Sequence, residues 1–278
     1  MDSPFEHIKK VLRSQLSDDQ ISCLPRRWEK IGDVLLVKYP ACLKGYEEQV
    51  CKVYAEVLHC KTVLDDVGGI SGVYREPQVR LLYGVPDTET IHREHGIRFK
   101  LDPQKVMFSS GNMHERRRMA YISNPSECVV DLFAGIGYFS LPMAKFSKPW
   151  RIIACEINPI AFQYLRENIV LNHVTEIVKP VFGDNQTCAP RLCADRVIMG
   201  YLHGTHRFLS VALSCLKPSG GVIHFHGIYS DEEVPMKPFS YIQEVARQNH
   251  KQATLLGQYV VKSYAPGVIH GVLDVEIR

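Results

Sequence analysis

The chain has 278 residues, of which 45% are hydrophobic and 23% charged, and its formal net charge is +3. This composition is typical of an ordinary globular protein and argues against a disordered, collagen-like or simple coiled-coil chain. No apolar run reaches the roughly 18 residues of a membrane span, and residues 1–7 lack the pattern of a secretory signal, so we expect no membrane partner.

Nine cysteines are scattered along the chain, and none belongs to a Cys-x-x-Cys pair. An odd, scattered set predicts reduced thiols in a cytoplasmic protein rather than a disulfide framework. Because the paired spacing of zinc ligands is missing, we predict no metal site.

The first hundred residues predict a small α+β domain. Apolar residues recur at helical spacing within 1–25, and a second helix is expected over 46–58. A strand is expected at 31–37, and short β-type runs broken by Gly and Pro follow. These runs are 73–74, 79–83 and 97–101.

After Phe108, strong apolar strands alternate with helices. This rhythm predicts an α/β fold with a mostly parallel sheet that helices cover on both faces. Two late strands separated by Pro266-Gly267 predict a hairpin at a sheet edge. We place a domain boundary near residue 105, which divides 1–105 from 106–278. The predicted strands are 128–132, 151–155, 178–182, 196–199, 221–226, 254–262 and 268–277, and the predicted helices are 139–146, 159–172 and 205–216.

The strongest chemical signal is the segment 129–139, VVDLFAGIGYF. A buried strand ends at Asp131, and a turn with Gly135 and Gly137 then leads into a helix. Ligands of doubly wound sheets bind outside the carboxyl ends of the strands, and glycines there let a ligand approach the backbone. The dinucleotide fingerprint would need a third glycine where Ser140 stands, so a pyrophosphate cradle is disfavoured.

Glu156 ends the next strand, about twenty residues after the glycine turn. An acid at this place can accept both hydroxyls of a ribose. The alternative is a solvated loop acid. Asn158-Pro159 follows, and this pair predicts the start of a helix.

Asp184 and Asn185 close the third strand and could hydrogen-bond an adenine amino group. Alone this signal is weak, because Asp-Asn is also a common turn. Together the three strand ends specify a nucleoside with ribose and adenine but without a strong phosphate cradle.

These strand ends resemble those of the Rossmann-like S-adenosylmethionine-dependent transferases. The segments 131–140, DLFAGIGYFS, and 107–116, MFSSGNMHER, are similar to the subgroup that modifies guanosine 37 of tRNA. In the guanine-37-N1 methyltransferases of that subgroup, the fourth strand typically ends in Asn-x-Pro. Here the segment 197–204 is VIMGYLHG, which resembles the other branch, the wybutosine-synthesis aminocarboxypropyltransferases.

The resemblance implies that S-adenosylmethionine is the donor substrate. Ser109 and Arg116 would hold its methionine portion, with the guanidinium pairing with the carboxylate through its planar fork. The alternative for Arg116 is a phosphate contact within a basic helix shared with Arg117 and Arg118. The residues expected to hold the nucleoside are Asp131, Phe133, Gly135, Gly137, Glu156, Asp184 and Asn185.

The resemblance also implies the acceptor, which is C7 of 4-demethylwyosine at position 37 of tRNA-Phe. Bases of an anticodon loop can be turned into a pocket, and basic clusters would bind phosphates. His203 could remove the proton or position the base, or it could be part of the loop structure. Tyr201 could stack on the base or pack in the core. We interpret His224 and His226 as structural.

Three other functions stay open at this point. A guanine-37 methyltransferase would transfer the methyl group instead. A non-catalytic RNA-binding module would not bind the donor, and a small-molecule methyltransferase would act without tRNA. For the adopted function no obligate protein partner is predicted.

Overall fold

The computed structural model describes residues 3–278, and the chain divides into two compact units, Met1–Ser110 and Gly111–Arg278. The domain boundary expected near residue 105 stays a prediction. Among residues 3–278, no helix is both long enough and apolar enough to cross a membrane.

The first unit is the predicted α+β fold. Its four-stranded sheet has the order β1-β2-β3-β4, and only β2 and β3 are parallel. The helix α3 connects these two strands, as a parallel crossover requires. The elements are α1 (Pro4–Leu12), α2 (Asp18–Ser22), β1 (Trp28–Ile31), β2 (Val34–Val37), η1 (Ala41–Leu43), α3 (Glu47–Leu58), β3 (Thr62–Ser71), β4 (Glu76–Gly84), and a two-stranded ribbon of β5 (Thr90–Glu94) and β6 (Ile97–Leu101).

Local chemistry explains where the first helices begin. The Ser3 hydroxyl caps α1, whose first residue is Pro4, and Ser17 with Gln20 forms a capping box on α2. The single helix expected within 1–25 is therefore two helices. Apolar faces of α1 and α3 then build one core with the inner face of β2.

Two strand predictions in this unit were wrong. The expected strand at 31–37 is a hairpin, because Gly32 at φ +58° makes a tight turn between β1 and β2. The β-branched and aromatic pair Val73–Tyr74 lies in the turn between β3 and β4, where both side chains are exposed.

The prediction that all thiols are reduced was also wrong. The structure pairs Cys23, at the end of α2, with Cys42 in η1, across a sequence separation of 19 residues. The other seven cysteines are free. Two segments that pack together bring the two thiols close, and the spacing of the cysteines in the sequence does not predict the pair.

The second unit is a seven-stranded sheet with the order β12-β13-β11-β10-β7-β8-β9. The five strands from β11 to β9 are parallel, and β13 is antiparallel to both of its neighbours. The predicted parallel sheet with an edge hairpin is confirmed. The strands are β7 (Cys128–Asp131), β8 (Arg151–Glu156), β9 (Val178–Phe182), β10 (Arg196–Met199), β11 (Gly221–Ser230), β12 (Ala253–Ala265) and β13 (Val268–Ile277).

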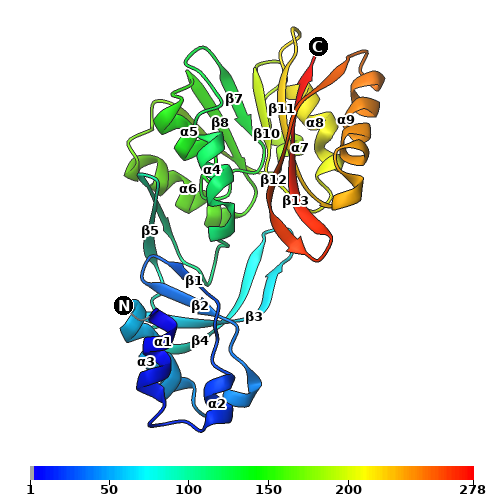
Figure 1. Ribbon diagram of the computed structural model, residues 1–278. Helices are drawn as coiled ribbons and strands as arrows, with labels where there is room; N and C mark the ends of the chain where they lie inside the picture. The colour runs from blue at the N-terminus through cyan, green and yellow to red at the C-terminus, as the bar shows by residue number, and fades with distance from the viewer. Residues whose placement is uncertain (1–2) are drawn as a thin grey trace. The chain divides into compact units, whose positions relative to one another are not determined.

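Helices cover both faces of this sheet (Figure 1), as predicted. The helices α4, α5 and α6 lie on one side, and α8 and α9 lie on the other, where they build a core with β10, β11 and β13. The expected helix 205–216 is a 3-10 turn followed by α8. The helix considered around Arg116 is α4, and α9 was not predicted. The bounds are η2 (Ser110–Asn112), α4 (Met113–Met119), α5 (Ser140–Phe146), α6 (Pro159–Leu171), α7 (Asn185–Cys188), η3 (Thr205–Phe208), α8 (Leu209–Cys215), η4 (Asp231–Glu233) and α9 (Met236–Gln248).

Candidate active site

The carboxyl ends of three neighbouring parallel strands meet at one edge of the second unit's sheet. Asp131 is the last residue of β7, Glu156 is the last residue of β8, and Asp184 follows β9 by two residues. Because β8 pairs with both β7 and β9, the structure brings these three acids to one edge. This is the position at which open α/β sheets bind their ligands.

Asp131 is completely buried and fixes the shape of the loop after β7. Its carboxylate accepts a hydrogen bond from the Ser140 hydroxyl at 2.7 Å and another from the Phe133 N–H at 3.3 Å. Burial raises the pKa of this carboxyl from 3.8 to about 6, although both hydrogen bonds oppose the shift. Ser140, where a dinucleotide fold would have its third glycine, is therefore the partner that ties the strand end to α5.

The two glycines of this loop are needed for its conformation. Gly135 has φ +57° and Gly137 has φ +102°. A Cβ atom on Gly137 would lie 2.5 Å from Cγ of the buried Leu141, and one on Gly135 would lie 2.3 Å from the Tyr138 ring. The loop can pass this close to its own helix only without side chains.

Glu156 is anchored at the loop. Its Oε2 accepts a hydrogen bond from the Gly135 N–H at 2.7 Å, and its Oε1 accepts one from the Asn158 N–H at 2.7 Å. Burial raises the pKa of the carboxyl, and the backbone N–H groups oppose that shift. The interpretation of Glu156 as a solvated loop acid is therefore disfavoured, since both oxygens have fixed directions.

The two polar residues after the third strand, Asp184 and Asn185, have different contacts. Asp184 caps the short helix α7 by accepting from the Gln186 N–H at 2.9 Å, and its part in ligand binding stays a prediction. Asn185 is buried, and its Nδ2 donates to the Leu132 carbonyl at 2.9 Å. Its Oδ1 is buried without a hydrogen-bond partner among the residues that the structure describes.

This orphaned oxygen tests whether the site fits an adenosine. A buried acceptor without a partner costs free energy, so such atoms usually face a bound group. An exocyclic amino group donates the hydrogen bond that Asn185 Oδ1 lacks, and the ribose hydroxyls match the acceptors of Glu156. The residues present therefore fit the nucleoside of S-adenosylmethionine.

An aromatic cluster stands beside these strand ends. The ring of Phe133 stacks on Tyr201, with 5.1 Å between centroids and 16° between planes, and Phe208 packs edge-on against both. His203 is exposed, and its ring lies 6.3 Å from that of Tyr264. Stacking on the base and packing in the core are both compatible with the half-buried position of Tyr201. The roles of Tyr201 and His203 stay predictions.

The three arginines of α4 have different surroundings. Arg116 is buried, and Arg117 is exposed. Arg118 donates paired hydrogen bonds to Glu115 and to Asp274, at 2.6–3.2 Å. The phosphate-binding basic helix considered as an alternative for Arg116 is disfavoured, since only Arg117 is exposed. Ser109 is half-buried near the end of the first unit, and its role stays a prediction.

Sequence reasoning missed a buried ionic network behind this helix. Asp274 also accepts from His224 at 2.6 Å, and His224 contacts Arg196 at 2.6 Å. The Arg118 and His224 contacts hold the pKa of Asp274 well below its usual range. His224 therefore has a structural contact, as interpreted. Its partner Asp274 lies 50 residues away in the sequence, so no local pattern could have predicted this pair.

His226, two residues further on β11, contacts His270 at 3.2 Å between ring nitrogens. Both rings are buried, and burial lowers the pKa of His270 to about 4. No group of three or more His, Cys, Asp or Glu residues that could hold a metal ion occurs within residues 3–278.

Comparison with known proteins agrees with this geometry. Residues 90–255 match the family described as "TRM5/TYW2 methyltransferase domain", and residues 8–88 match the "TYW2 N-terminal domain". The chain is 42% identical to the tRNA(Phe) (4-demethylwyosine(37)-C(7)) aminocarboxypropyltransferase of Pyrococcus horikoshii, over 97% of this chain and 96% of that protein. It is 37% identical to the tRNA (guanine(37)-N(1))-methyltransferase Trm5b of Pyrococcus abyssi, over 91% of this chain and 76% of that protein.

A solved structure shows the same architecture. P. horikoshii TYW2 in complex with MeSAdo superposes with a TM-score of 0.88 at 40% identity, and the match covers 98% of both chains. The predicted Rossmann-like transferase fold is confirmed. Because one family match covers the N-terminal region and another covers most of the remainder, the chain belongs to the TYW2 family, which is related to the TRM5 methyltransferases.

Proposed function

We propose that this chain transfers the 3-amino-3-carboxypropyl group of S-adenosylmethionine to C7 of 4-demethylwyosine at position 37 of tRNA-Phe. The observation that carries the proposal is the 42% identity, over nearly the full length of both chains, to an enzyme named for this reaction. The related P. horikoshii TYW2 was solved with MeSAdo, which is the product expected when the amino-acid arm leaves the donor.

The chemistry is a substitution at a sulfonium. The electron pair of ring carbon C7 forms a bond to Cγ of the donor, and the Cγ–S bond breaks with its electrons moving to sulfur. Methylthioadenosine leaves as a neutral thioether, and C7 then loses its proton. The protein must therefore present Cγ, and not the methyl group, to the base.

The nucleoside half of the donor is held at the three strand ends. Glu156 accepts from the ribose hydroxyls, and Asn185 Oδ1 accepts from the adenine amino group. The glycine loop between Asp131 and Ser140 lets the donor approach the backbone, and Phe133 lies beside it. Asp184 contributes by capping α7, which fixes the backbone at Asn185.

The methionine half is assigned to Arg116 and Ser109. The buried guanidinium would pair with the donor carboxylate, and its fork would fix the direction of the arm. Arg116→Lys keeps the charge but loses the fork. We expect weaker donor binding and slower turnover, and unchanged values of both would reject this assignment.

The acceptor base is proposed to enter from the anticodon loop of the tRNA. Tyr201 stacks on the base or lines its pocket, and His203 assists removal of the C7 proton. The cytoplasm is the expected location. No obligate protein partner is needed for this chemistry.

The test is mass spectrometry of nucleosides from hypomodified tRNA-Phe that carries 4-demethylwyosine, after incubation with the protein and S-adenosylmethionine. The expected product carries the added aminocarboxypropyl group at this nucleoside. A methylated guanosine in a tRNA that carries unmodified G37 would instead support the guanine-37 methyltransferase, the alternative suggested by the similarity to Trm5b.

A further inference from the structure

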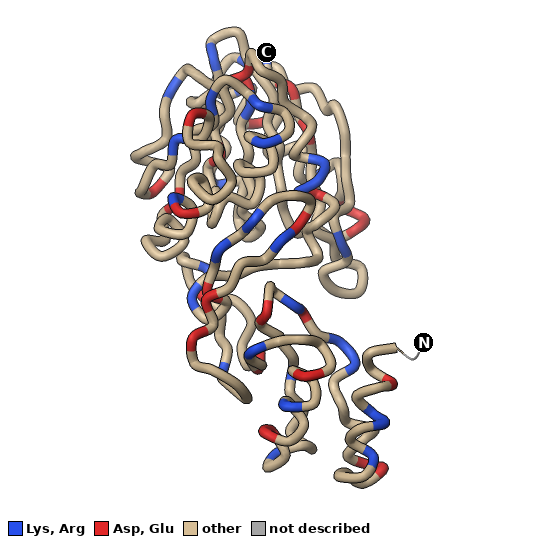
Figure 2. The backbone as a smooth tube through the Cα atoms, turned by 90° about the vertical axis from the view of Figure 1, so that its left-hand side faces the viewer, with Lys and Arg blue, Asp and Glu red and all other residues tan. Residues whose placement is uncertain are grey.

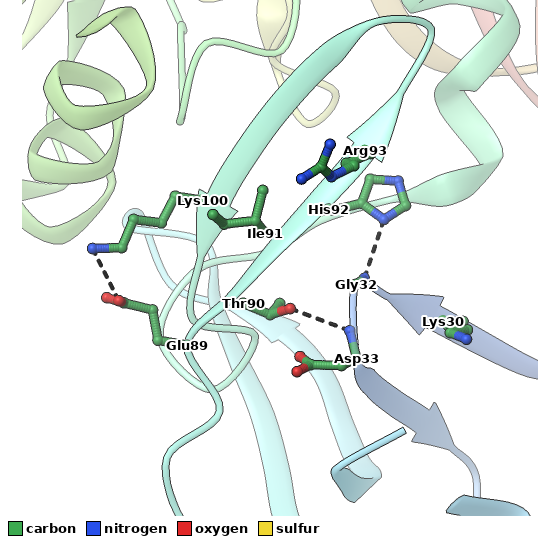
Figure 3. A pocket seen from close by; sticks show the side chains of 9 residues that line it. All are labelled: Lys30, Gly32, Asp33, Glu89, Thr90, Ile91, His92, Arg93 and Lys100. Carbon is green, nitrogen blue, oxygen red and sulfur yellow. Dashed lines mark hydrogen bonds and ion pairs between the residues drawn. The ribbon is translucent and has the colours of Figure 1, made fainter. Parts of the chain in front are cut away.

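The first unit holds a pocket, lined in part by charged side chains, that the transfer chemistry does not use. It has a volume of about 760 Å³ and lies between the β5–β6 ribbon and the turn that joins β1 to β2 (Figure 3). This size is sufficient for a nucleotide-sized group. Its lining includes Lys30 on β1, Ile91 and Arg93 on β5, and Lys100 on β6.

The ribbon has one buried face and one outward face. Ile97, Phe99 and Leu101 of β6 are buried on the inner side. On the outer side the register places Arg93 directly opposite Arg98, and Ile91 directly opposite Lys100. This face therefore gathers positive charge, and positive charge attracts an anionic ligand.

Two carboxylates lie near this face. Glu89 lies 2.9 Å from the Lys100 ammonium. Asp33 lies 3.6 Å from the Lys61 ammonium, and its buried Oδ1 accepts no hydrogen bond from residues 3–278. Arg93 is exposed and makes no ion pair with any residue in the described range 3–278. Figure 2 marks the basic and acidic positions along the backbone, and on this short ribbon Arg93, Arg98 and Lys100 lie on one face.

Hydrogen bonds join the ribbon to the turn on the other side of the pocket. The Thr90 hydroxyl accepts from the Asp33 N–H at 3.2 Å, and the His92 ring nitrogen Nδ1 accepts from the Gly32 N–H at 3.3 Å. A Cβ atom on Gly32 would meet the Thr90 hydroxyl, so the turn and the ribbon are in direct contact. The His92 ring also packs on Phe108, with 4.7 Å between centroids. These contacts tie β5, the strand that carries Arg93, to the turn between β1 and β2.

We propose that the outer face of the β5–β6 ribbon binds the sugar–phosphate backbone of the tRNA, as a contact separate from recognition of the modified base. The proposal rests on the proposed function only for the identity of the RNA. Arginine forks match phosphate oxygens, and Ile91, whose side chain is 42% exposed between the cations, offers an apolar surface to a ribose.

The test measures binding of fluorescently labelled tRNA to the full chain, in the presence of methylthioadenosine, over a series of salt concentrations. Arg93→Glu is expected to weaken binding about tenfold and to reduce the slope of log K against log salt by about one, because one phosphate contact is lost. The matched control is Lys52→Glu, an equal charge reversal at an exposed position of α3. It is expected to leave the slope unchanged.

Two further variants keep the result interpretable. Arg93→Gln removes the charge without reversing it and is expected to reduce the slope by a similar amount. Ile91→Ser is expected to weaken binding without changing the slope, because the lost contact is apolar. Circular dichroism and thermal unfolding of the full chain verify that each variant is folded.

The proposal is overturned if Arg93→Glu and Lys52→Glu have the same tRNA affinity and the same slope. Because this measurement needs no turnover, it stays valid if the group transferred proves to be a different one. A chain that transfers the aminocarboxypropyl group but shows no effect of Arg93→Glu would refute the ribbon contact alone.

Discussion

Glu156 at the end of β8 accepts a hydrogen bond from the backbone N–H of Gly135, with 2.7 Å between nitrogen and oxygen. The acid of the second strand end thereby holds the glycine loop that follows the first strand end. The glycine loop and Glu156, which the sequence analysis treated as separate signals, are therefore joined by a hydrogen bond. A change in either residue is therefore expected to disturb the whole nucleoside site.

Glu156→Gln is expected to weaken binding of methylthioadenosine about tenfold to a hundredfold. Hydrogen bonds to a charged group are worth about 1.5–3 kcal/mol, and the amide retains only part of them. Isothermal titration calorimetry measures the affinity. Glu176→Gln, at an exposed position of the same unit, is the control. Equal affinities of the two variants would contradict the assignment of Glu156 to the ribose.

Gly137→Ala is expected to destabilise the second unit by about 2 kcal/mol more than Gly267→Ala does. Both glycines have positive φ, but Gly267 has no atom within 4 Å of an added Cβ, whereas Gly137 would meet the buried Leu141. The difference in stability between the two variants therefore measures mainly the steric overlap of the added Cβ with Leu141. Thermal unfolding measures it, and similar melting temperatures would show that the loop can relax.

Asn185→Ala is expected to reduce discrimination between methylthioadenosine and its inosine analogue. The analogue has no amino group to donate to the orphaned Oδ1, so the original chain should prefer the adenosine compound. Without the side chain this preference is lost, which a double-mutant cycle on the two affinities measures. If the preference persists in Asn185→Ala, the adenine amino group is recognised elsewhere.

His270 is expected to make the second unit less stable in acid. Its pKa is about 4 in the fold, below the ordinary value of 6.5, because burial disfavours the charged ring. The stabilisation is complete above about pH 6.5 and is lost as the pH falls toward 4, by about 3 kcal/mol. The buried ring of His226, whose pKa also lies well below 6.5, adds to the same trend.

Urea unfolding followed by Trp150 fluorescence, in a Trp28→Phe background, measures this loss between pH 7 and 4. His270→Gln is expected to flatten the pH dependence, and His250→Gln, at an exposed position, is expected to keep it. A pH dependence that His270→Gln leaves intact would assign the acid sensitivity to other groups.

The parallel sheet and the nucleoside site could be predicted because their signals are local. The predicted strands 128–132, 151–155 and 178–182 are short and mostly apolar, and the functional residue of each lies at its carboxyl end or within three residues of it. A parallel arrangement then brings the strand ends together without further information. The N-cap at Asn158, which accepts from the N–H groups of Ile160 and Ala161, was predictable for the same reason.

Features that join distant segments could not be predicted. Arg118 and Asp274 are 156 residues apart, and the Cys23–Cys42 pair depends on how α2 and η1 pack. The helix α9 was missed because its apolar positions are sparse and Pro238 stands near its start. The orphaned Oδ1 of Asn185 is a property of three-dimensional burial, and only the structure reveals it.

The decisive experiment gives the protein hypomodified tRNA-Phe and S-adenosylmethionine that is labelled in one sample at the methyl carbon and in another at the carboxyl carbon. We predict that only the carboxyl label enters the tRNA and that the methyl label leaves in methylthioadenosine. Methyl label in the tRNA, with the carboxyl label retained in S-adenosylhomocysteine, would contradict the proposed transfer of the amino-acid arm.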